Sequence, residues 1–187
     1  MKNLFKNNLF KLPIFLMIVG VICTASLSIV NYFTSTKIEA NSQEQVLNAC
    51  KSSFNNHENY ASFVITEVDC PTSLKEVGIS KKNKVEDSSS LIGYVYVGSV
   101  QGFADKIDFV VSYEGGKLHK IKVTYEQESN KKGINFIKSN YVDYDLTKPN
   151  FFETSDYSKG VAGASMTGKK GLIDAINKCS EDYLSTK

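Results

Sequence analysis

The chain has 187 residues, which is enough for one globular domain of ordinary size and a short appendage. Its 22 Lys and Arg residues nearly balance its 20 Asp and Glu residues, so the formal net charge is only +2. Nucleic-acid-binding domains need a basic patch or stripe, and this charge balance argues against a nucleic-acid partner.

The first predicted element is an apolar segment near the N-terminus. Residues 12–36 contain no charged side chain, and about 20 apolar residues are enough to cross the hydrocarbon core of a bilayer. We therefore expect a transmembrane anchor over residues 12–36. Lysines precede it without any acidic residue, so the positive-inside rule predicts a cytoplasmic segment at residues 1–11 and an extracytoplasmic remainder.

Two alternatives for this segment stay open. A cleaved signal peptide would also begin with lysines and an apolar core, although its core is typically only about 7–15 residues long. A lipoprotein signal would use Cys23, but Ile22 stands before it, where such signals usually carry a small residue.

Residues 37–90 are expected to form a linker with a helical extension. Ser42 and Gln45 form a capping-box pattern ahead of the apolar residues Val46 and Leu47, which predicts the start of a short helix. Residues 80–90 are rich in Lys and Ser and almost lack apolar side chains, which predicts a solvated loop.

From Leu91 onward the apolar pattern has a period of two, which is typical of half-buried strands. The alternating segments are residues 91–99, 107–112 and 118–125. Gly115 and Gly116 supply a hairpin turn between the last two, and helical spacing returns from Leu172 to Leu184. The prediction is an α+β fold in which helices pack on an antiparallel sheet, with residues 91–187 as the principal domain.

The cysteines and histidines limit the chemistry of the external part. Cys50, Cys70 and Cys179 lie where oxidation is permitted, and they allow one disulfide and leave one thiol over, without selecting the pair. The two histidines, His57 and His119, are far apart in sequence, and the chain has no CxxC pair or Cys/His cluster. We therefore expect no metal site.

The segment with the most chemical information runs from Gly160 to Gly171, at the start of the terminal helical pattern. Small residues let the backbone approach a ligand, and the N–H groups of a helix's first turn attract phosphate. Lys169 and Lys170 add positive charge, and the hydroxyl of Thr167 can donate to phosphate oxygens or be esterified by them. The same residues are typical of a simple turn and helix N-cap, so both interpretations stay open on the residues alone.

Five residues of this segment resemble a known signature. The run Gly163-Ala164-Ser165-Met166-Thr167 is similar to the S-G-A-T/S-x-T pattern of the FMN-binding domain family, which is best known from the G subunit of Rnf complexes and the C subunit of Nqr complexes. In that family the last threonine of the signature carries the flavin, and this position corresponds to Thr167.

Two further segments extend the resemblance over about residues 90–180. Gly93-Tyr94 and the hairpin residues 116–123 resemble the family's G-Y strand and its G-K-I-x-x-I/V-x-V hairpin. Residues 126–133 lie where the family carries H-x-E-T-P-G-L-G, and the agreeing positions are Glu128, Ser129, which is conservative, and Gly133. The single N-terminal span is also the family's usual arrangement.

The resemblance implies a function and a set of site residues. It implies an electron-transfer subunit of an Rnf/Nqr-like, ion-translocating redox complex, which works with other membrane subunits. FMN would be attached to the Thr167 hydroxyl through a phosphodiester formed by a separate FAD-dependent flavin transferase, and Glu128 and Ser129 would line the pocket of the flavin ring. The cofactor-binding residues expected are Thr167, Gly163, Ala164, Ser165, Met166, Glu128, Ser129, Gly133 and Lys169.

Other interpretations of the same domain stay open. Aromatic side chains such as Tyr94, Tyr96 or Phe103 could shield the flavin ring, although aromatic residues are more typical of the core. A cell-surface binding or structural module with the same fold and no covalent flavin is the second interpretation, and the departures from the family pattern at Lys159 and Asn130 favour it. A serine hydrolase is disfavoured, because the small-residue segment lacks the second glycine of a nucleophile elbow.

Overall fold

The structure is a computed structural model that describes residues 8–88, 90–126, 132–146 and 165–186. The chain divides into two compact units, Met1–Glu44 and Gln45–Lys187. Helix α1 (Asn8–Ser52) supplies the described part of the first unit.

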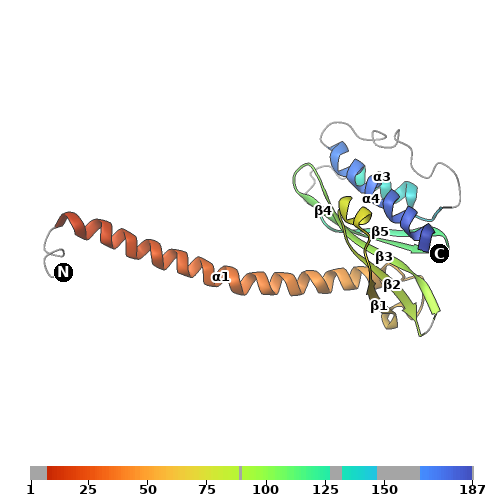
Figure 1. Cartoon of the computed structure of the whole chain (residues 1–187), viewed down its shortest axis with the longest axis horizontal. Coiled ribbons are helices and arrows are strands. Elements are labelled where there is room, and N and C mark those ends of the chain that lie inside the picture. Colours follow the sequence, from red (N-terminus) through yellow and green to blue (C-terminus); the bar gives the residue numbers. More distant parts are fainter. Residues whose placement is uncertain (1–7, 89, 127–131, 147–164, 187) are drawn as a thin grey trace. The chain divides into compact units, whose positions relative to one another are not determined.

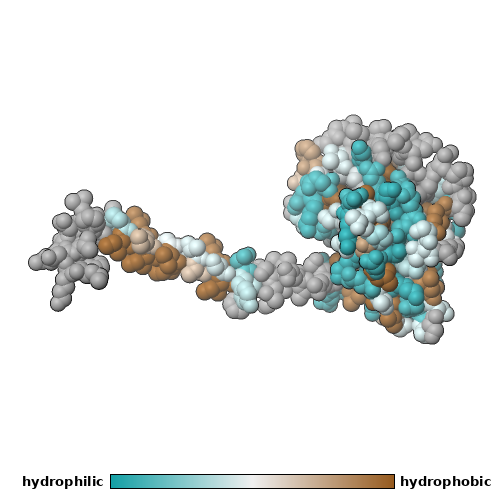
Figure 2. All heavy atoms as spheres, viewed as in Figure 1, coloured by the Kyte–Doolittle hydropathy of each residue, from teal (hydrophilic) through white to brown (hydrophobic). Residues whose placement is uncertain are grey.

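The apolar part of α1 has the character of a membrane span. The 20 residues Pro13–Tyr32 have a mean hydropathy of 2.4, which makes the helix long and apolar enough to cross a bilayer (Figure 2). The hydroxyls of Thr24 and Ser26 donate to the carbonyl oxygens of Gly20 and Ile22 at 2.8 Å, so each is satisfied inside the helix. The predicted N-terminal helix of spanning length is confirmed, and both a retained anchor and a signal sequence have this character.

The helix start predicted at Ser42 is wrong, because α1 continues through this residue to Ser52. The segment after the apolar run, residues 33–45, contains neither Gly nor Pro. Without a residue that breaks the helical hydrogen-bond pattern, the capping-box residues lie inside a helix that has already begun.

The second unit is built on a six-stranded sheet in which every strand pairs antiparallel with its sequence neighbours, in the order β1 to β6 (Figure 1). The strands are β1 (Val64–Val68), β2 (Ile79–Asp87), β3 (Ser90–Gln101), β4 (Lys106–Glu114), β5 (Lys117–Tyr125) and β6 (Tyr144–Asp145). The helices after α1 are the 3₁₀ helix η2 (Tyr60–Ser62), α2 (Thr72–Glu76), α3 (Lys132–Tyr141) and α4 (Ser165–Thr186). The predicted α+β fold is confirmed.

The three predicted strands and their hairpin correspond to β3, β4 and β5. The turn between β4 and β5 has positive φ angles of 59° at Gly115 and 84° at Gly116, which glycine adopts at little cost. The terminal helical pattern corresponds to α4, which begins at Ser165.

The solvated loop predicted at residues 80–90 is wrong, because β2 occupies Ile79–Asp87. Its lysines are paired: Lys81 Nζ lies 3.0 Å from Glu67 Oε2 on β1, and Lys82 Nζ lies 2.6 Å from Asp182 Oδ2 on α4. Opposite charges on neighbouring elements therefore stabilise a strand that a polar composition concealed. The segment 37–90 is accordingly more than a linker, since β1 and β2 belong to the same compact unit as the rest of the sheet.

Side chains from both faces of the sheet are buried. On β3 and β4, Tyr96 and Phe109 pack in one cluster with residues of α3 and α4, whereas Val95 and Val110 pack in another with the end of α1. Because successive strand residues point to opposite faces, the two clusters are two cores on either side of one sheet. Helices α3 and α4 cover the first face (Figure 1).

Candidate functional site

Thr167 lies in the first turn of α4 with an exposed side chain. The first N–H groups of a helix have no acceptor within the helix, and this end carries a partial positive charge that favours anions. No acidic residue occurs in the first turn of α4. A phosphate attached to the Thr167 hydroxyl would therefore sit in a favourable field.

The Thr167 side chain opens onto a surface groove with a volume of about 470 Å³. The groove is lined by residues of α4, of the end of β3 and of the corner between α2 and β2, namely Thr167, Lys170, Gly171, Asp174, Ser99, Val100, Gln101, Glu76, Val77 and Gly78. Its volume falls within the range of about 300–1,000 Å³ that is usual for small-molecule sites.

Two glycines fix the walls of this groove. A Cβ atom on Gly171 would lie 3.2 Å from the Cβ of Val100, so glycine lets the first half of α4 approach β3 closely. Gly78 has a φ of +89°, and a Cβ there would lie 2.2 Å from the carbonyl oxygen of Ser99. Larger residues at either position would push the walls of the groove apart.

The groove carries charges of both signs. Lys170 is exposed beside Thr167 and could balance a phosphate, whereas Glu76 and Asp174 place carboxylates among the other lining residues. Lys169, which was expected beside the phosphate, is buried, and its Nζ lies 3.7 Å from the centroid of the Phe136 ring on α3. Of the two lysines, Lys170 is the one that lines the groove, and a cofactor contact by Lys169 stays a prediction.

The remaining expected site residues are only partly described. Gly133 is the second residue of α3, and Ser165 and Met166 open α4, with their backbone alone described. The other four lie outside the described residues: Glu128, Ser129, Gly163 and Ala164.

The helices α3 and α4, which begin with the last residues of the two family-like segments, are in contact. Phe136 follows Gly133 by one helical turn, Lys169 follows Thr167 by two residues, and these two side chains are in contact. Strand β5 ends at Tyr125, which is aligned with Asp108 near the start of β4, and the β3 residue Gln101 is aligned with Lys106. The chain therefore leaves β5 at the same end of the sheet as the groove.

The three aromatic residues considered as a flavin shield lie in different environments. Tyr96 is fully buried and donates a hydrogen bond to Asp182 Oδ2 at 2.7 Å, so it is a core residue, and burial together with this carboxylate raises its pKa. Tyr94 is half-buried at the opposite end of α4. Phe103 is 65% exposed in the turn after β3, two residues after the groove residue Gln101. Of the three aromatic residues it therefore lies nearest in sequence to the groove.

Sequence reasoning missed a polar cluster at this end of the sheet. The hydroxyl of Tyr125 donates to Asp105 Oδ2 at 2.9 Å, and Lys106 Nζ lies 5.7 Å from the centroid of the Tyr125 ring. The backbone N–H of Lys106 and the Tyr125 hydroxyl hold the pKa of Asp105 below its usual value. The sequence signal was weak, because these residues come together only when β4 and β5 pair.

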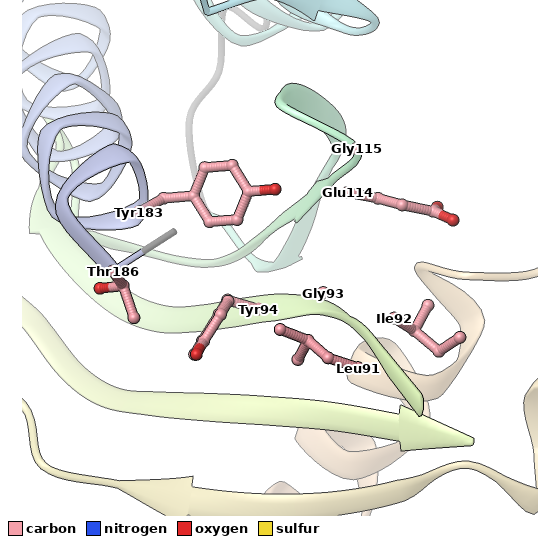
Figure 3. Close-up of a pocket in the computed structure, with 8 residues that line it drawn as sticks. All are labelled: Leu91, Ile92, Gly93, Tyr94, Glu114, Gly115, Tyr183 and Thr186. Atoms are coloured by element: carbon pink, nitrogen blue, oxygen red, sulfur yellow. The ribbon is translucent and has the colours of Figure 1, made fainter. Parts of the chain in front are cut away.

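A second cavity, of about 400 Å³, lies at the other end of α4 (Figure 3). It is lined by Leu91, Ile92, Gly93, Tyr94, Glu114, Gly115, Tyr183 and Thr186. Thr167 and Thr186 lie about 28 Å apart along the helix, at about 1.5 Å per residue. The Gly93-Tyr94 pair thus lines a cavity distant from the Thr167 groove.

Folding brings the two histidines to one carboxylate. His57 Nε2 lies 2.6 Å from Glu114 Oε1, and His119 Nδ1 lies 3.8 Å from Glu114 Oε2. The His119 ring also stacks on Phe54, with centroids 5.7 Å apart. Within the described ranges, no group of three or more His, Cys, Asp and Glu residues could hold a metal ion.

Comparisons with known proteins do not assign the chain to a family. No protein-family model matches it, and a search of the curated proteins found no match. The resemblance to the FMN-binding domain family therefore rests on the motif residues alone.

Proposed function

We propose that the protein is a membrane-anchored, extracytoplasmic flavoprotein that carries FMN on Thr167 through a phosphodiester. In this proposal it is an electron-transfer subunit of an Rnf/Nqr-like, ion-translocating redox complex, with its N-terminus in the cytoplasm and the Gln45–Lys187 unit outside. A FAD-dependent flavin transferase attaches the FMN, and the other membrane subunits are its electron donor and acceptor.

The observation that carries the proposal is the exposed Thr167 hydroxyl in a groove beside the contact between α3 and α4, the helices that begin with the last residues of the two motif segments. The signature threonine, Thr167, is exposed in the first turn of α4 and lines a groove of about 470 Å³. The second motif ends at Gly133, and α3, which contains it, contacts α4 through Phe136 and Lys169. A flavin tethered at Thr167 would lie beside the contact between α4 and α3, the helix in which the second motif ends.

The residues around Thr167 fit an attached nucleotide phosphate. The hydroxyl is accessible to a modifying enzyme, the start of α4 favours an anion, and Lys170 adds a cation. The apolar part of the groove, formed by Val77 and Val100, could exclude water from one side of the ring. When bound, FMN supplies the one- and two-electron chemistry, while the chain fixes its position and tunes its surroundings.

A covalent tether also suits the proposed location. A loosely bound cofactor outside the cytoplasm would be lost by dilution, whereas an ester to Thr167 keeps it on the domain. The apolar helix Pro13–Tyr32 would hold the domain beside the membrane subunits with which it exchanges electrons.

The test is the mass of the full chain after coexpression with a flavin transferase that serves this family. The expected mass is that of the apoprotein plus one FMN less one water, together with a yellow fluorescent band that survives denaturing electrophoresis. Thr167→Ala should abolish both signals. Ser185→Ala is the matched control, because it removes an exposed hydroxyl at the far end of the same helix and should leave the flavin in place.

The competing proposal is a cell-surface binding or structural module without covalent flavin. The observation that favours it is the pair of carboxylates in the groove, Glu76 and Asp174, which would repel a phosphate that moved along it. A colourless protein of unmodified mass under the coexpression conditions would decide for this module.

A further inference from the structure

The fold separates the three cysteines of the second unit into two groups. Cys50 belongs to the core on the α1 side of the sheet, with Phe54 and Val110. Cys70 and Cys179 both belong to the core on the other side, with Leu74 and Ile79. The sheet therefore lies between Cys50 and the other two thiols, and the only pairing among these three that does not cross it is Cys70 with Cys179.

Cys70 and Cys179 are separate, buried thiols of the same core in this structure, and two features relate the start of β2 to α4. At one end, Gly78 and Asp174 line the same groove, and further along, Lys82 Nζ lies 2.6 Å from Asp182 Oδ2. On α4, Cys179 lies between Asp174 and Asp182. On the segment that leads into β2, Ile79 lies between Gly78 and Lys82.

The position of Cys70 follows from its contact with β2. Its Sγ donates to the carbonyl oxygen of Ile79 at 3.9 Å, and helix α2, which directly follows it, packs against both β2 and α4. Cys179 is fully buried on α4 in the same core cluster. The two thiols thus belong to one core, to which β2, α2 and α4 all contribute.

The electrostatics agree with this geometry. Burial raises the pKa of Cys179, as do the carboxylate of Asp182 and then the thiolate charge of Cys70. Burial likewise raises the pKa of Cys70. Neutral, desolvated thiols exchange slowly, so a bond between them would form while the chain is still folding and would then be protected from reductants.

We propose that Cys70 and Cys179 form a disulfide when the domain folds outside the cytoplasm, and that Cys50 remains a thiol. The oxidant is a protein disulfide of a thiol oxidoreductase. Cys70 thiolate attacks it to form a mixed disulfide and releases one thiol of the oxidant, and Cys179 thiolate then attacks the Cys70 sulfur and releases the second. The two thiol protons end on the oxidant, which gains the two electrons.

The bond would join the β1–α2 corner to α4, the helix that begins with the Thr167 turn. Cys179 lies about 18 Å along α4 from Thr167, at about 1.5 Å per residue. The disulfide would therefore hold the helix, and with it one wall of the groove, against the β1–α2 corner. This inference rests on one part of the proposed function, the extracytoplasmic location of the domain, and does not depend on the flavin.

The test is a two-step thiol map of the full chain isolated from membranes of an exporting host. Free thiols are first alkylated with light iodoacetamide under denaturing, non-reducing conditions. The disulfides are then reduced, and the thiols that this releases are alkylated with heavy iodoacetamide. The expected result is heavy label on Cys70 and Cys179, light label on Cys23 and Cys50, and a peptide pair joining residues 70 and 179 before reduction. Light label on Cys70 and Cys179, or a bond to Cys50, would overturn the proposal.

Variants separate this inference from the flavin proposal. Cys50→Ser should leave the Cys70–Cys179 bond intact, whereas Cys70→Ala should expose Cys179 to the light reagent. Reduction should lower the melting temperature of the wild type by on the order of 10 °C and that of Cys70→Ala by little. The flavin mass on the Thr167 peptide is measured in the same digest. Bonded cysteines together with an unmodified Thr167 would refute only the flavin proposal. Free thiols together with a flavinylated Thr167 would refute only the disulfide proposal.

Discussion

The buried ion pair between β2 and α4 gives the sharpest stability prediction. Lys82 Nζ lies 2.6 Å from Asp182 Oδ2, and the side chains of the two residues are only 7% and 15% exposed. Asp182 also accepts a hydrogen bond from the Tyr96 hydroxyl at 2.7 Å, and Lys82 donates one to Thr186 Oγ1 at 3.0 Å. Replacing Asp182 by Asn keeps the shape of the side chain, removes its charge and leaves one oxygen that can still accept a hydrogen bond.

The expected cost of Asp182→Asn is about 3–5 kcal/mol in the free energy of unfolding, because the Lys82 ammonium stays buried without its counter-ion. The hydroxyl of Thr186 and the faces of Tyr94 and Tyr96, whose centroids lie 5.3 and 5.8 Å from Nζ, compensate only in part. Since domains are typically stable by about 5–15 kcal/mol, this single change should remove a large share of the total.

The assay is urea unfolding of the full chain in detergent, followed by tyrosine fluorescence, since the chain has 10 tyrosines and no tryptophan. With a slope of about 2 kcal/mol per molar urea, the midpoint should fall by about 2 M. Adding Lys82→Met should recover much of the loss, because the unpaired charge is then absent.

A matched control lies next to the pair on the same helix. Lys178 Nζ lies 2.6 Å from Glu181 Oε2, the same distance, but the two side chains are 45% and 66% exposed. Glu181→Gln should therefore cost less than about 1 kcal/mol. If Asp182→Asn were as mild as this control, the assignment of Lys82 to a desolvated environment would be refuted.

Three further predictions follow from burial, sterics and hydrogen bonding. Burial raises the pKa of the Cys50 thiol from 9.0 to about 11. At pH 8, alkylation of Cys50 by iodoacetamide should therefore be about 100-fold slower in the native protein than in urea. Equal alkylation rates would contradict the raised pKa. A Cβ on Gly93 would lie 2.1 Å from a carbonyl oxygen of β4, so Gly93→Ala should lower the free energy of unfolding in urea by about 3 kcal/mol. The control is Gly115→Asn, at an open position with a φ of +59°, which should lower it by less than about 1 kcal/mol. Tyr125→Phe removes a hydrogen-bond donor to Asp105, whose pKa is depressed in the folded state. A carboxyl NMR titration should then show the pKa of Asp105 raised toward its usual value. An unchanged titration would exclude the hydrogen bond.

The hairpins formed by β3, β4 and β5 were predictable from sequence because their pattern is local. The strands between Leu91 and Tyr125 alternate apolar and polar residues, and the paired glycines at 115 and 116 specify the turn between two of them. The terminal helix was predictable for the same reason, since its apolar face repeats every three to four residues.

Strand β2 was missed because its stability depends on partners that are remote in sequence. From sequence alone, Lys82 is expected to be solvated, because its partner Asp182 lies about 100 residues away on α4. Its neighbour Asn83 is buried as well. Composition alone cannot distinguish a paired lysine on a strand from a solvated lysine in a loop.

The candidate site was predictable at its centre and not at its walls. The small-residue pattern led to Thr167, but Val100 and Gly78 line the groove only because β3 and the α2–β2 corner fold against α4. The same packing separates the neighbouring lysines: Lys170 lies at the groove, and Lys169 is buried over an α3 ring. Helical spacing puts adjacent residues about 100° apart, but it does not tell which of them faces a partner helix.

The most direct test of the central claim is the mass of the peptide that contains Thr167, taken from the membranes of the organism that makes the protein. The proposal predicts a peptide heavier by one FMN less one water, with fragment ions that place the addition on the Thr167 side chain. A peptide of unmodified mass from membranes in which other flavinylated proteins are detected would contradict it.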